Sequence, residues 1–207
     1  MAIALDVMGG DTPVRVRVAA AVRAANDFGL DLLLIGDKAL ISAELSRHQY
    51  PKKLIEIVHC SETVEMHESP AQALRQKKDS SIRIAVDLLK EGRVEAVVSA
   101  GNTGASMATS KFVLKSIPEI ERPAIATLMP SVNRDHPFVL LDIGANIDCK
   151  PIYLLQFALM GDAYARTLLK LDNPRIALLN NGEEEGKGNL IVQQAYELME
   201  RSSLNFV

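Results

Sequence analysis

The sequence predicts a three-layer α/β/α fold built on a largely parallel sheet. Short runs rich in Val, Ile and Leu alternate with longer amphipathic segments along the chain. Strands that are buried on both faces and separated by helices are typical of parallel sheets covered by helices on each side. With 207 residues, of which 48% are hydrophobic and 24% charged, the chain has enough apolar surface for such a core.

The first half of the chain contains four expected strands joined mainly by helices. A strand over 2–7 precedes a helix that begins at Thr12-Pro13 and ends near Gly29, because proline suits the first helical turn and glycine the position after the last. Ser80-Ser81 and Gly92 bound another helix in the same way. The remaining elements expected here are strands at 31–35, 54–60 and 94–98 and a helix at about 38–48.

The second half departs from this alternation at one place. Two strand-like runs, 124–129 and 138–142, have no helix between them, so the connection from Pro130 to Pro137 suits either a hairpin or a passage between subdomains. The other elements expected are helices at about 103–115, 151–170 and 188–201, a strand at 175–179 and the beginning of a strand at 204–207.

Composition excludes several classes of protein. The net charge is −3 and aromatic residues are 4% with no Trp, so neither a basic surface nor stacking platforms for nucleic acid are expected. Asp6 interrupts the first apolar run, which therefore differs from a signal peptide, and no run approaches the roughly 18 residues that span a bilayer. Cys60 and Cys149 stand far apart, and we expect both to be reduced thiols of a cytoplasmic protein.

Polar, glycine-rich segments follow four of the expected strands. In an open parallel sheet, ligands bind beyond the carboxyl ends of the strands, where loops and the N-termini of the following helices converge. One such loop is common, but four at equivalent positions predict a binding site. The segments are 6–11, 99–104, 142–148 and 180–188.

The second of these segments is the best candidate for binding an anion. Gly101 and Gly104 let the backbone approach a ligand closely, and the following helix would present free N–H groups at its positive end. Asn102 and Thr103 would add neutral donors, and Ser99 precedes them at the end of the strand. The alternative is an ordinary strand-to-helix turn in which Thr103 caps the helix.

The fourth segment contains Gly-Lys but differs from a phosphate-binding Walker loop. The spacing between Gly182 and Gly186 is one residue short, and Gly188 occupies the position where a Mg²⁺-binding Ser or Thr is required. Lys187 could still orient a phosphate or protonate a leaving group. The alternative is a solvated charge run, in which the carboxylates of 183–185 interact favourably with the start of a helix.

Other signatures of enzyme sites are missing or weak. No GxGxxG follows the first strand, the four His residues lack metal-ligand spacing, and no Ser or Cys stands in the setting of a covalent nucleophile. We therefore expect neither a metal nor a cofactor. Arg75, Lys77 and Lys78 form a small basic patch, which is either a solvated face or a contact for an acidic partner.

Together the four segments resemble the bacterial phosphate acyltransferase family of phospholipid synthesis. The matching stretches are ALDVMGGD at 4–11, SAGNTGA at 99–105, LDIGANID at 141–148 and GEEEGKG at 182–188. Residues 69–81 also resemble the family's Pro…Ala…Arg…Lys…Ser-Ser segment, so the resemblance covers essentially the whole chain. It implies a fold similar to phosphotransacetylase and the isocitrate/isopropylmalate dehydrogenases. It also implies a cytoplasmic homodimer that transfers a fatty acyl group from acyl-carrier-protein thioester to inorganic phosphate, giving acyl phosphate for phosphatidic acid synthesis.

On this resemblance we assign roles to particular residues. Phosphate attacks the thioester directly, so the site needs an anion-binding loop, charge stabilisation and a donor for the departing thiolate. Lys187 would orient phosphate and neutralise developing charge. The assigned groups are phosphate-binding Ser99, Gly101, Asn102, Thr103 and Gly104; catalytic Lys187, Asn146 and Asp142; cleft-shaping Asp6, Gly9 and Gly10; and Arg75, Lys77 and Lys78 for contact with the acidic carrier protein.

The chain also departs from the family pattern. The family continues through an Asp-Gly-Phe-x-Gly-Asn loop and an apolar helical hairpin linked with membrane attachment and dimerisation, and neither occurs in these 207 residues. We therefore expect residues 1–207 to be one α/β catalytic region that is truncated at its C-terminal end. Peripheral association with the inner face of the membrane is expected only for the full-length chain.

Two alternatives to this function stay open. The first is a dehydrogenase of the related fold that uses a metal and a nicotinamide cofactor, against which the missing GxGxxG argues. The second is a non-catalytic fragment that binds carrier protein or phosphate without turnover.

Overall fold

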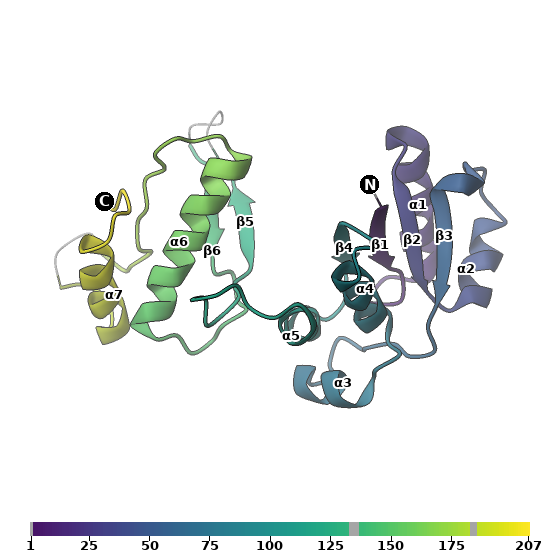
Figure 1. Cartoon of the computed structure of the whole chain (residues 1–207), viewed down its shortest axis with the longest axis horizontal. Helices are drawn as coiled ribbons and strands as arrows, with labels where there is room; N and C mark the ends of the chain where they lie inside the picture. Colours follow the sequence, from purple (N-terminus) through teal and green to yellow (C-terminus); the bar gives the residue numbers. More distant parts are fainter. Residues whose placement is uncertain (1, 133–136, 183–185) are drawn as a thin grey trace. The chain divides into compact units, whose positions relative to one another are not determined.

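The computed structural model describes residues 2–132, 137–182 and 186–207, and Figure 1 shows its elements along the chain. The chain divides into two compact units, a first unit, Met1–Lys115, and a second unit, Ser116–Val207. The expectation that residues 1–207 form one catalytic region stays a prediction.

The first unit is built on a four-stranded parallel sheet in the order β3–β2–β1–β4. Its strands are β1 (Ala2–Asp6), β2 (Asp31–Gly36), β3 (Ile55–His59) and β4 (Ala96–Ser99). The register places Asp6 at the end of β1 opposite Ser99 at the end of β4. Two of the predicted loops therefore leave the sheet side by side at the same edge. The parallel sheet predicted from the sequence is confirmed in this unit.

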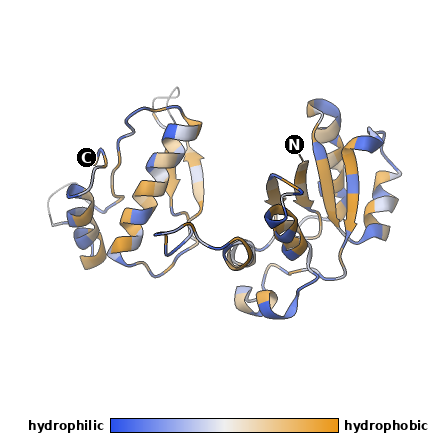
Figure 2. Ribbon diagram, in the orientation of Figure 1, coloured by the Kyte–Doolittle hydropathy of each residue, from blue (hydrophilic) through white to orange (hydrophobic). Residues whose placement is uncertain are grey.

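Helices cover both faces of the sheet. The helices of the first unit are α1 (Val14–Phe28), α2 (Lys38–Leu45), α3 (Pro70–Gln76), α4 (Ser81–Lys90) and α5 (Thr103–Leu114), with a 3₁₀ turn at Lys52–Leu54. Leu34 of β2 packs with α1 and α2, whereas its neighbour Ile35 packs with α4. Successive side chains of a strand point to opposite faces, so β2 contributes to two cores. Its residues 32–35 are all apolar, and Figure 2 shows the strand largely in the hydrophobic colour.

Most helix boundaries agree with the sequence signals, with two differences. Gly29 follows α1 in the left-handed conformation (φ 64°), as its position predicts. The side chain of Asn102 caps α5 by accepting the Ala105 N–H, so Thr103 is not the cap. The short helix α3 was not expected, because its polar sequence buries only Ala73 and offers no apolar stripe.

The second unit contains a two-stranded antiparallel sheet and two helices among its described residues. β5 (Ala126–Met129) pairs with β6 (Phe138–Leu141), which agrees with the hairpin alternative. α6 (Pro151–Leu168) packs against α7 (Leu190–Glu200). No helix within the described ranges is both long enough and apolar enough to cross a membrane.

The strand predicted at 175–179 is not formed in the described structure. Ile176 makes one isolated parallel bridge with Phe206, which is too little pairing to build a ladder. This segment, together with β6, α6 and α7, instead lines a cavity of about 650 Å³, a size within the range of small-molecule sites. The cavity wall is mostly apolar, and Asp142 and Asn146 contribute polar atoms to it.

Candidate functional site

Asp6 joins the loops that follow β1 and β4. Asp6 is 2% exposed, and its Oδ1 accepts the N–H groups of Met8 at 3.0 Å and Gly9 at 2.9 Å. The Ser99 hydroxyl donates to Asp6 Oδ2 at 2.8 Å, and Ser99 Oγ in turn accepts the Gly101 N–H at 3.1 Å. One buried carboxylate therefore holds both loops together, and its cleft-shaping role stays a prediction.

The two loops approach each other too closely for side chains to fit between them. A Cβ at Gly9 would lie 2.5 Å from Asp6 Oδ2 and 2.9 Å from the Gly101 Cα. A Cβ at Gly10, whose φ is +95°, would lie 2.5 Å from the carbonyl oxygen of Ala100. Glycine at these positions lets the two backbones touch, so the shape of this edge depends on them.

Arg17 on α1 also holds the loop after β1. Its Nε donates to the Val7 carbonyl oxygen at 2.7 Å, and its Nη1 donates to Thr12 Oγ1 at 2.8 Å. Burial lowers the pKa of Arg17, and the nearby Asp6 carboxylate opposes that shift. The buried guanidinium and the buried carboxylate thus position the same loop.

Arg17 is not among the residues predicted for the site, although its position in the sequence carries a signal. Arg17 lies between Val14 and Val18 in the helical stripe whose other members are apolar. A charged residue on the buried face of a helix requires polar partners, because an unpaired buried charge is strongly destabilising. That position alone could have identified Arg17 as a structural partner of the neighbouring loop.

The N-terminus of α5 presents backbone donors beside these loops. The Asn102 cap satisfies the Ala105 N–H, and helix geometry leaves the preceding N–H groups of Thr103 and Gly104 without intrahelical acceptors. Thr103 is exposed, so its hydroxyl faces solvent at the same helix end. These groups, at the positive end of the α5 dipole, suit an anion.

Ser99 and Asn102 are used differently from the prediction, in which their side chains donate to phosphate. Ser99 donates its hydroxyl hydrogen to Asp6. Asn102 donates its amide hydrogens to backbone carbonyl oxygens of the segment 65–68. Both side chains therefore lie at the predicted edge of the sheet, but they position loops there and have no hydrogen left for a ligand.

The three residues of the predicted basic patch have different surroundings in the structure. Arg75 and Lys78 are exposed, as a partner contact requires. Lys77 instead donates from Nζ to the Thr63 carbonyl oxygen and forms an ion pair with Glu68. The hydrogen bond from Lys77 lowers the pKa of Glu68. Lys77 therefore stabilises its own unit, and only Arg75 and Lys78 face outward.

In the second unit, Asp142 organises the loop that follows β6. Its Oδ1 accepts the Ile125 N–H at 2.8 Å and the Ala145 N–H at 3.2 Å. Its Oδ2 accepts the backbone N–H of Asn146 at 2.7 Å and the Asn146 side-chain amide at 3.1 Å. The Asn146 amide also donates to the Pro123 carbonyl oxygen at 2.9 Å. Asp142 and Asn146 thus form a hydrogen-bonded pair, and their catalytic role stays a prediction.

These hydrogen bonds determine the charge of Asp142. Burial raises the pKa of Asp142, but hydrogen bonds from Ile125, Asn146 and Ala145 outweigh burial, so the pKa lies below its ordinary value of 3.8. The carboxylate form is therefore the one that holds the loop.

We expect the chemical shifts of the Ile125 and Asn146 amide protons to follow the protonation of Asp142, with a midpoint below the ordinary aspartate range. Because the native pKa is lowered, the contribution of Asp142 to stability is fully present above the unfolded pKa of about 3.9 and is lost as the pH falls through the native value. Amide chemical shifts followed by NMR through the acidic range measure the midpoint. Asp142→Asn should abolish the titration and Asp148→Asn should retain it; a midpoint at or above the ordinary value contradicts the expectation.

Lys187 lies on the exposed loop that precedes α7. Gln193 in the first turn of α7 donates from Nε2 to the carbonyl oxygens of Gly186 at 2.6 Å and Gly188 at 3.2 Å. The backbone on both sides of Lys187 is therefore anchored to the helix. The acidic part of the predicted charge run, 183–185, lies outside the described residues.

The two cysteines are poor nucleophiles in this structure. Both are free, and Cys60 is buried. Burial, followed by the charges of Asp6 and Asp79, raises the pKa of the Cys60 thiol to about 11. Burial and the charges of Asp142 and Asp148 also raise the pKa of Cys149. At neutral pH both residues are thiols, whereas the nucleophilic form of cysteine is the thiolate.

Comparison with known proteins places this geometry in a family. A family model described as "Fatty acid synthesis protein" matches residues 1–207. The chain is 50% identical over 205 residues to the "Phosphate acyltransferase" of Syntrophotalea carbinolica, an alignment that covers 99% of this chain and 58% of that protein. It is 49% identical over 207 residues to the "Phosphate acyltransferase" of a Geobacter species, which covers 100% of this chain and 58% of that protein.

A solved structure shares the fold. The phosphotransacetylase from Streptococcus pyogenes aligns with a TM-score of 0.68 at 20% identity, over 99% of this chain and 67% of that one. The predicted similarity to phosphotransacetylase in fold is therefore confirmed. The chain spans 58% of the length of the two curated relatives.

Proposed function

The chain belongs to the family described as "Fatty acid synthesis protein", and on that basis we propose that it carries residues of an enzyme that transfers an acyl group to inorganic phosphate. The observation that carries this proposal is the identity of about one half to relatives named phosphate acyltransferase over the whole chain. We propose a fatty acyl thioester of acyl carrier protein as the donor. The product, an acyl phosphate, would serve phosphatidic acid synthesis.

The proposed reaction needs no covalent intermediate on the protein. A phosphate oxygen attacks the thioester carbonyl carbon, the new C–O bond forms, the C–S bond breaks, and the departing thiolate of the carrier takes up a proton. Protonated, partly or fully buried cysteines are consistent with this direct attack. The protein must then bind phosphate, stabilise negative charge and orient the thioester.

We assign phosphate binding to the first unit. The N–H groups of Thr103 and Gly104 and the Thr103 hydroxyl would donate to phosphate at the positive end of α5. Gly101 would keep the backbone open to the ligand. Asp6 and Ser99 would hold the two loops together through their hydrogen bond, and this support is a different role from donating to the ligand.

For the second unit we assign Lys187 to orient phosphate and neutralise the charge that develops on the thioester oxygen. A lysine ammonium is a compact positive charge with three donors, which suits this role. Asp142 and Asn146 would position the loop after β6, since their hydrogen bonds are made with each other and with the backbone.

Arg75 and Lys78 would contact the acidic carrier protein, because both are exposed cations on and just after α3. We further propose that the enzyme works as a homodimer in the cytoplasm. Peripheral association with the inner face of the membrane would belong to a longer form of the chain. The family resemblance supports these three points.

The test is consumption of an acyl-carrier-protein thioester with and without inorganic phosphate. The 207-residue chain is assayed first. Where its gene encodes a longer polypeptide, that polypeptide is assayed as well. We expect release of the free carrier thiol to depend on phosphate and to be matched by formation of acyl phosphate. Thiol release that is independent of phosphate contradicts the proposal. Binding of phosphate or carrier without turnover in the longer polypeptide supports the non-catalytic alternative.

A further inference from the structure

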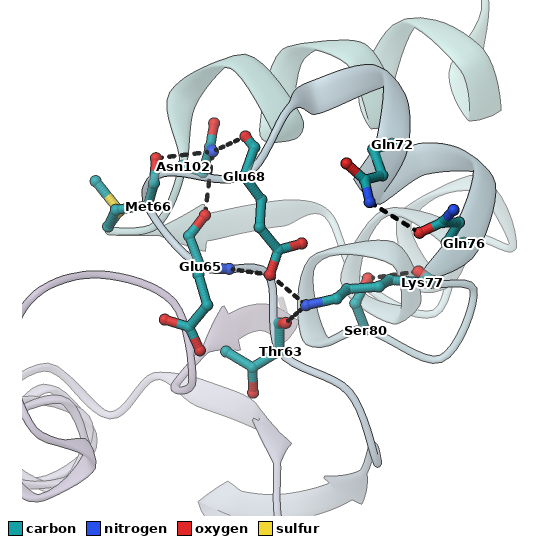
Figure 3. A network of polar contacts seen from close by, with 9 residues as sticks. All are labelled: Thr63, Glu65, Met66, Glu68, Gln72, Gln76, Lys77, Ser80 and Asn102. Atoms are coloured by element: carbon teal, nitrogen blue, oxygen red, sulfur yellow. Dashed lines mark hydrogen bonds and ion pairs between the residues drawn. The ribbon is translucent and has the colours of Figure 1, made fainter.

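We propose that Asn102 is a positioning residue that fixes the segment 65–68 as one wall of the phosphate site at the N-terminus of α5. This inference rests on the proposed function. It adds to that site the segment 65–68, which the sequence did not indicate. The contacts that carry it lie within the first unit and are drawn in Figure 3.

The Asn102 side chain performs two tasks at once. Its Oδ1 caps α5 by accepting the Ala105 N–H at 3.0 Å. Its Nδ2 reaches the carbonyl oxygens of Glu65 at 3.2 Å, Met66 at 3.1 Å and Glu68 at 2.9 Å. An amide nitrogen carries two hydrogens, so three carbonyl oxygens converge on two donors. This convergence is more than a helix cap requires, and it ties a separate segment to the end of α5.

Lys77, the residue that follows α3, anchors the same segment a second time. Glu68 accepts the N–H of Glu65 at 3.2 Å and forms the ion pair with Lys77. Lys77 also donates to the Thr63 carbonyl oxygen, so one ammonium joins Glu68 to the chain just before the segment. Figure 3 shows that both residues reach Glu68, Asn102 at its backbone carbonyl oxygen and Lys77 at its carboxylate. The segment is therefore held by two sets of contacts that meet at Glu68.

The starts of α3 and α5 also meet. A Cβ at Gly104 would lie 2.7 Å from Pro70 Cγ, so glycine in the first turn of α5 leaves room for the first residue of α3. The segment 65–68 leads directly into this contact. Its position beside the Thr103 and Gly104 N–H groups follows from the chain connection as well as from Asn102.

This placement matters for an anion because of the carbonyl dipoles. Three carbonyl oxygens, each with partial negative charge, point toward Asn102 next to the donors that we assign to phosphate. The two amide hydrogens of Asn102 are shared among these three oxygens and so reduce their repulsion of a phosphate. Without the amide, the segment must either shift to find other donors or leave unpaired acceptors beside the site.

Replacing Asn102 with Ser separates the two tasks. Serine caps a helix about as well as asparagine, adds no charge and cannot donate to three carbonyl oxygens. We expect Asn102→Ser to weaken the affinity for inorganic phosphate by about ten- to a hundredfold, a size typical of a misplaced binding group. In turnover assays the KM for phosphate should rise, whereas kcat at saturating phosphate should be retained.

The matched control is Asn189→Ser. Asn189 caps α7 by accepting the Val192 N–H at 3.0 Å, so the same change tests the cost of a cap substitution in the second unit. We expect it to leave phosphate affinity unchanged. Lys77→Met should weaken phosphate binding in the same direction as Asn102→Ser, and Lys77→Arg should restore much of it, because arginine can keep the ion pair with Glu68.

Isothermal titration of inorganic phosphate into the 207-residue chain distinguishes this inference from the proposed function. If the unaltered chain binds phosphate and Asn102→Ser binds it equally well, the positioning role is wrong and the proposed function stands. If the unaltered chain and any longer form both fail to bind phosphate, the phosphate site itself is wrong and both proposals are overturned. Equal losses of affinity in Asn102→Ser and Asn189→Ser would also overturn the positioning role.

Discussion

Replacing Lys187 with Met should lower turnover of the acyl thioester by about a hundred- to a thousandfold, the size seen when one group that stabilises transition-state charge is removed. Methionine retains the length and flexibility of the side chain but removes the positive charge. Lys187 is exposed on a loop whose backbone is anchored by Gln193, so the folded structure does not depend on burying this side chain. The measurement is phosphate-dependent thiol release, alongside thermal unfolding of each variant.

Lys90→Met is the matched control for that experiment. Lys90 is an exposed lysine in the last turn of α4 and has no assigned role, so its replacement should leave turnover and thermal unfolding nearly unchanged. A Lys187→Met variant that turns over at the normal rate would remove Lys187 from the mechanism. A variant that loses activity together with its cooperative unfolding would instead show a structural role for Lys187.

Replacing Asp6 with Ala should destabilise the first unit by about 3–5 kcal/mol, since buried donors that lose their acceptor retain their desolvation cost. Three donors lose their acceptor at once: the N–H groups of Met8 and Gly9 and the Ser99 hydroxyl. The loss should appear as a lower midpoint of urea unfolding, with the slope of the transition unchanged.

Two variants control for this change. Asp6→Asn keeps the shape and an acceptor oxygen, and the Ser99 hydroxyl can rotate to accept from the new amide, so we expect a smaller loss of stability. Asp11→Ala removes an exposed carboxylate from the same loop and should change stability by no more than about 0.5 kcal/mol. If Asp6→Ala is as stable as Asp11→Ala, the hydrogen bonds of Asp6 do not hold the two loops together.

The sequence was informative about the first unit because its local signals agree with each other. β2 is apolar on both faces, and Gly29 stands where α1 must end. The second unit was harder to predict. The run 175–179 has the composition of a strand, but composition cannot show whether a neighbouring strand is in place to pair with it. In the structure only Ile176 is bridged, to Phe206.

The location of the candidate site was easier to predict than the roles of its side chains. Glycine-rich loops after strands indicate an edge of the sheet, and β1 and β4 do bring two of them together. Ser99, Asn102 and Lys77 look like available polar groups in the sequence. Their partners are Asp6, the segment 65–68 and Glu68, which are separated from them by nine to 93 residues. No local pattern reveals contacts across such separations.

The hydrogen bond between Asp6 and Ser99 links the proposed phosphate site to the assembly of the sheet. The two residues are 93 positions apart, and β4 lies at the edge of the sheet, next to β1. Closing so long a loop costs conformational entropy before the contact exists. A chain in which β4 has detached therefore has no paired loops to receive an anion. A ligand that binds only the complete form shifts the equilibrium toward it, so phosphate at this site would hold β4 in the sheet.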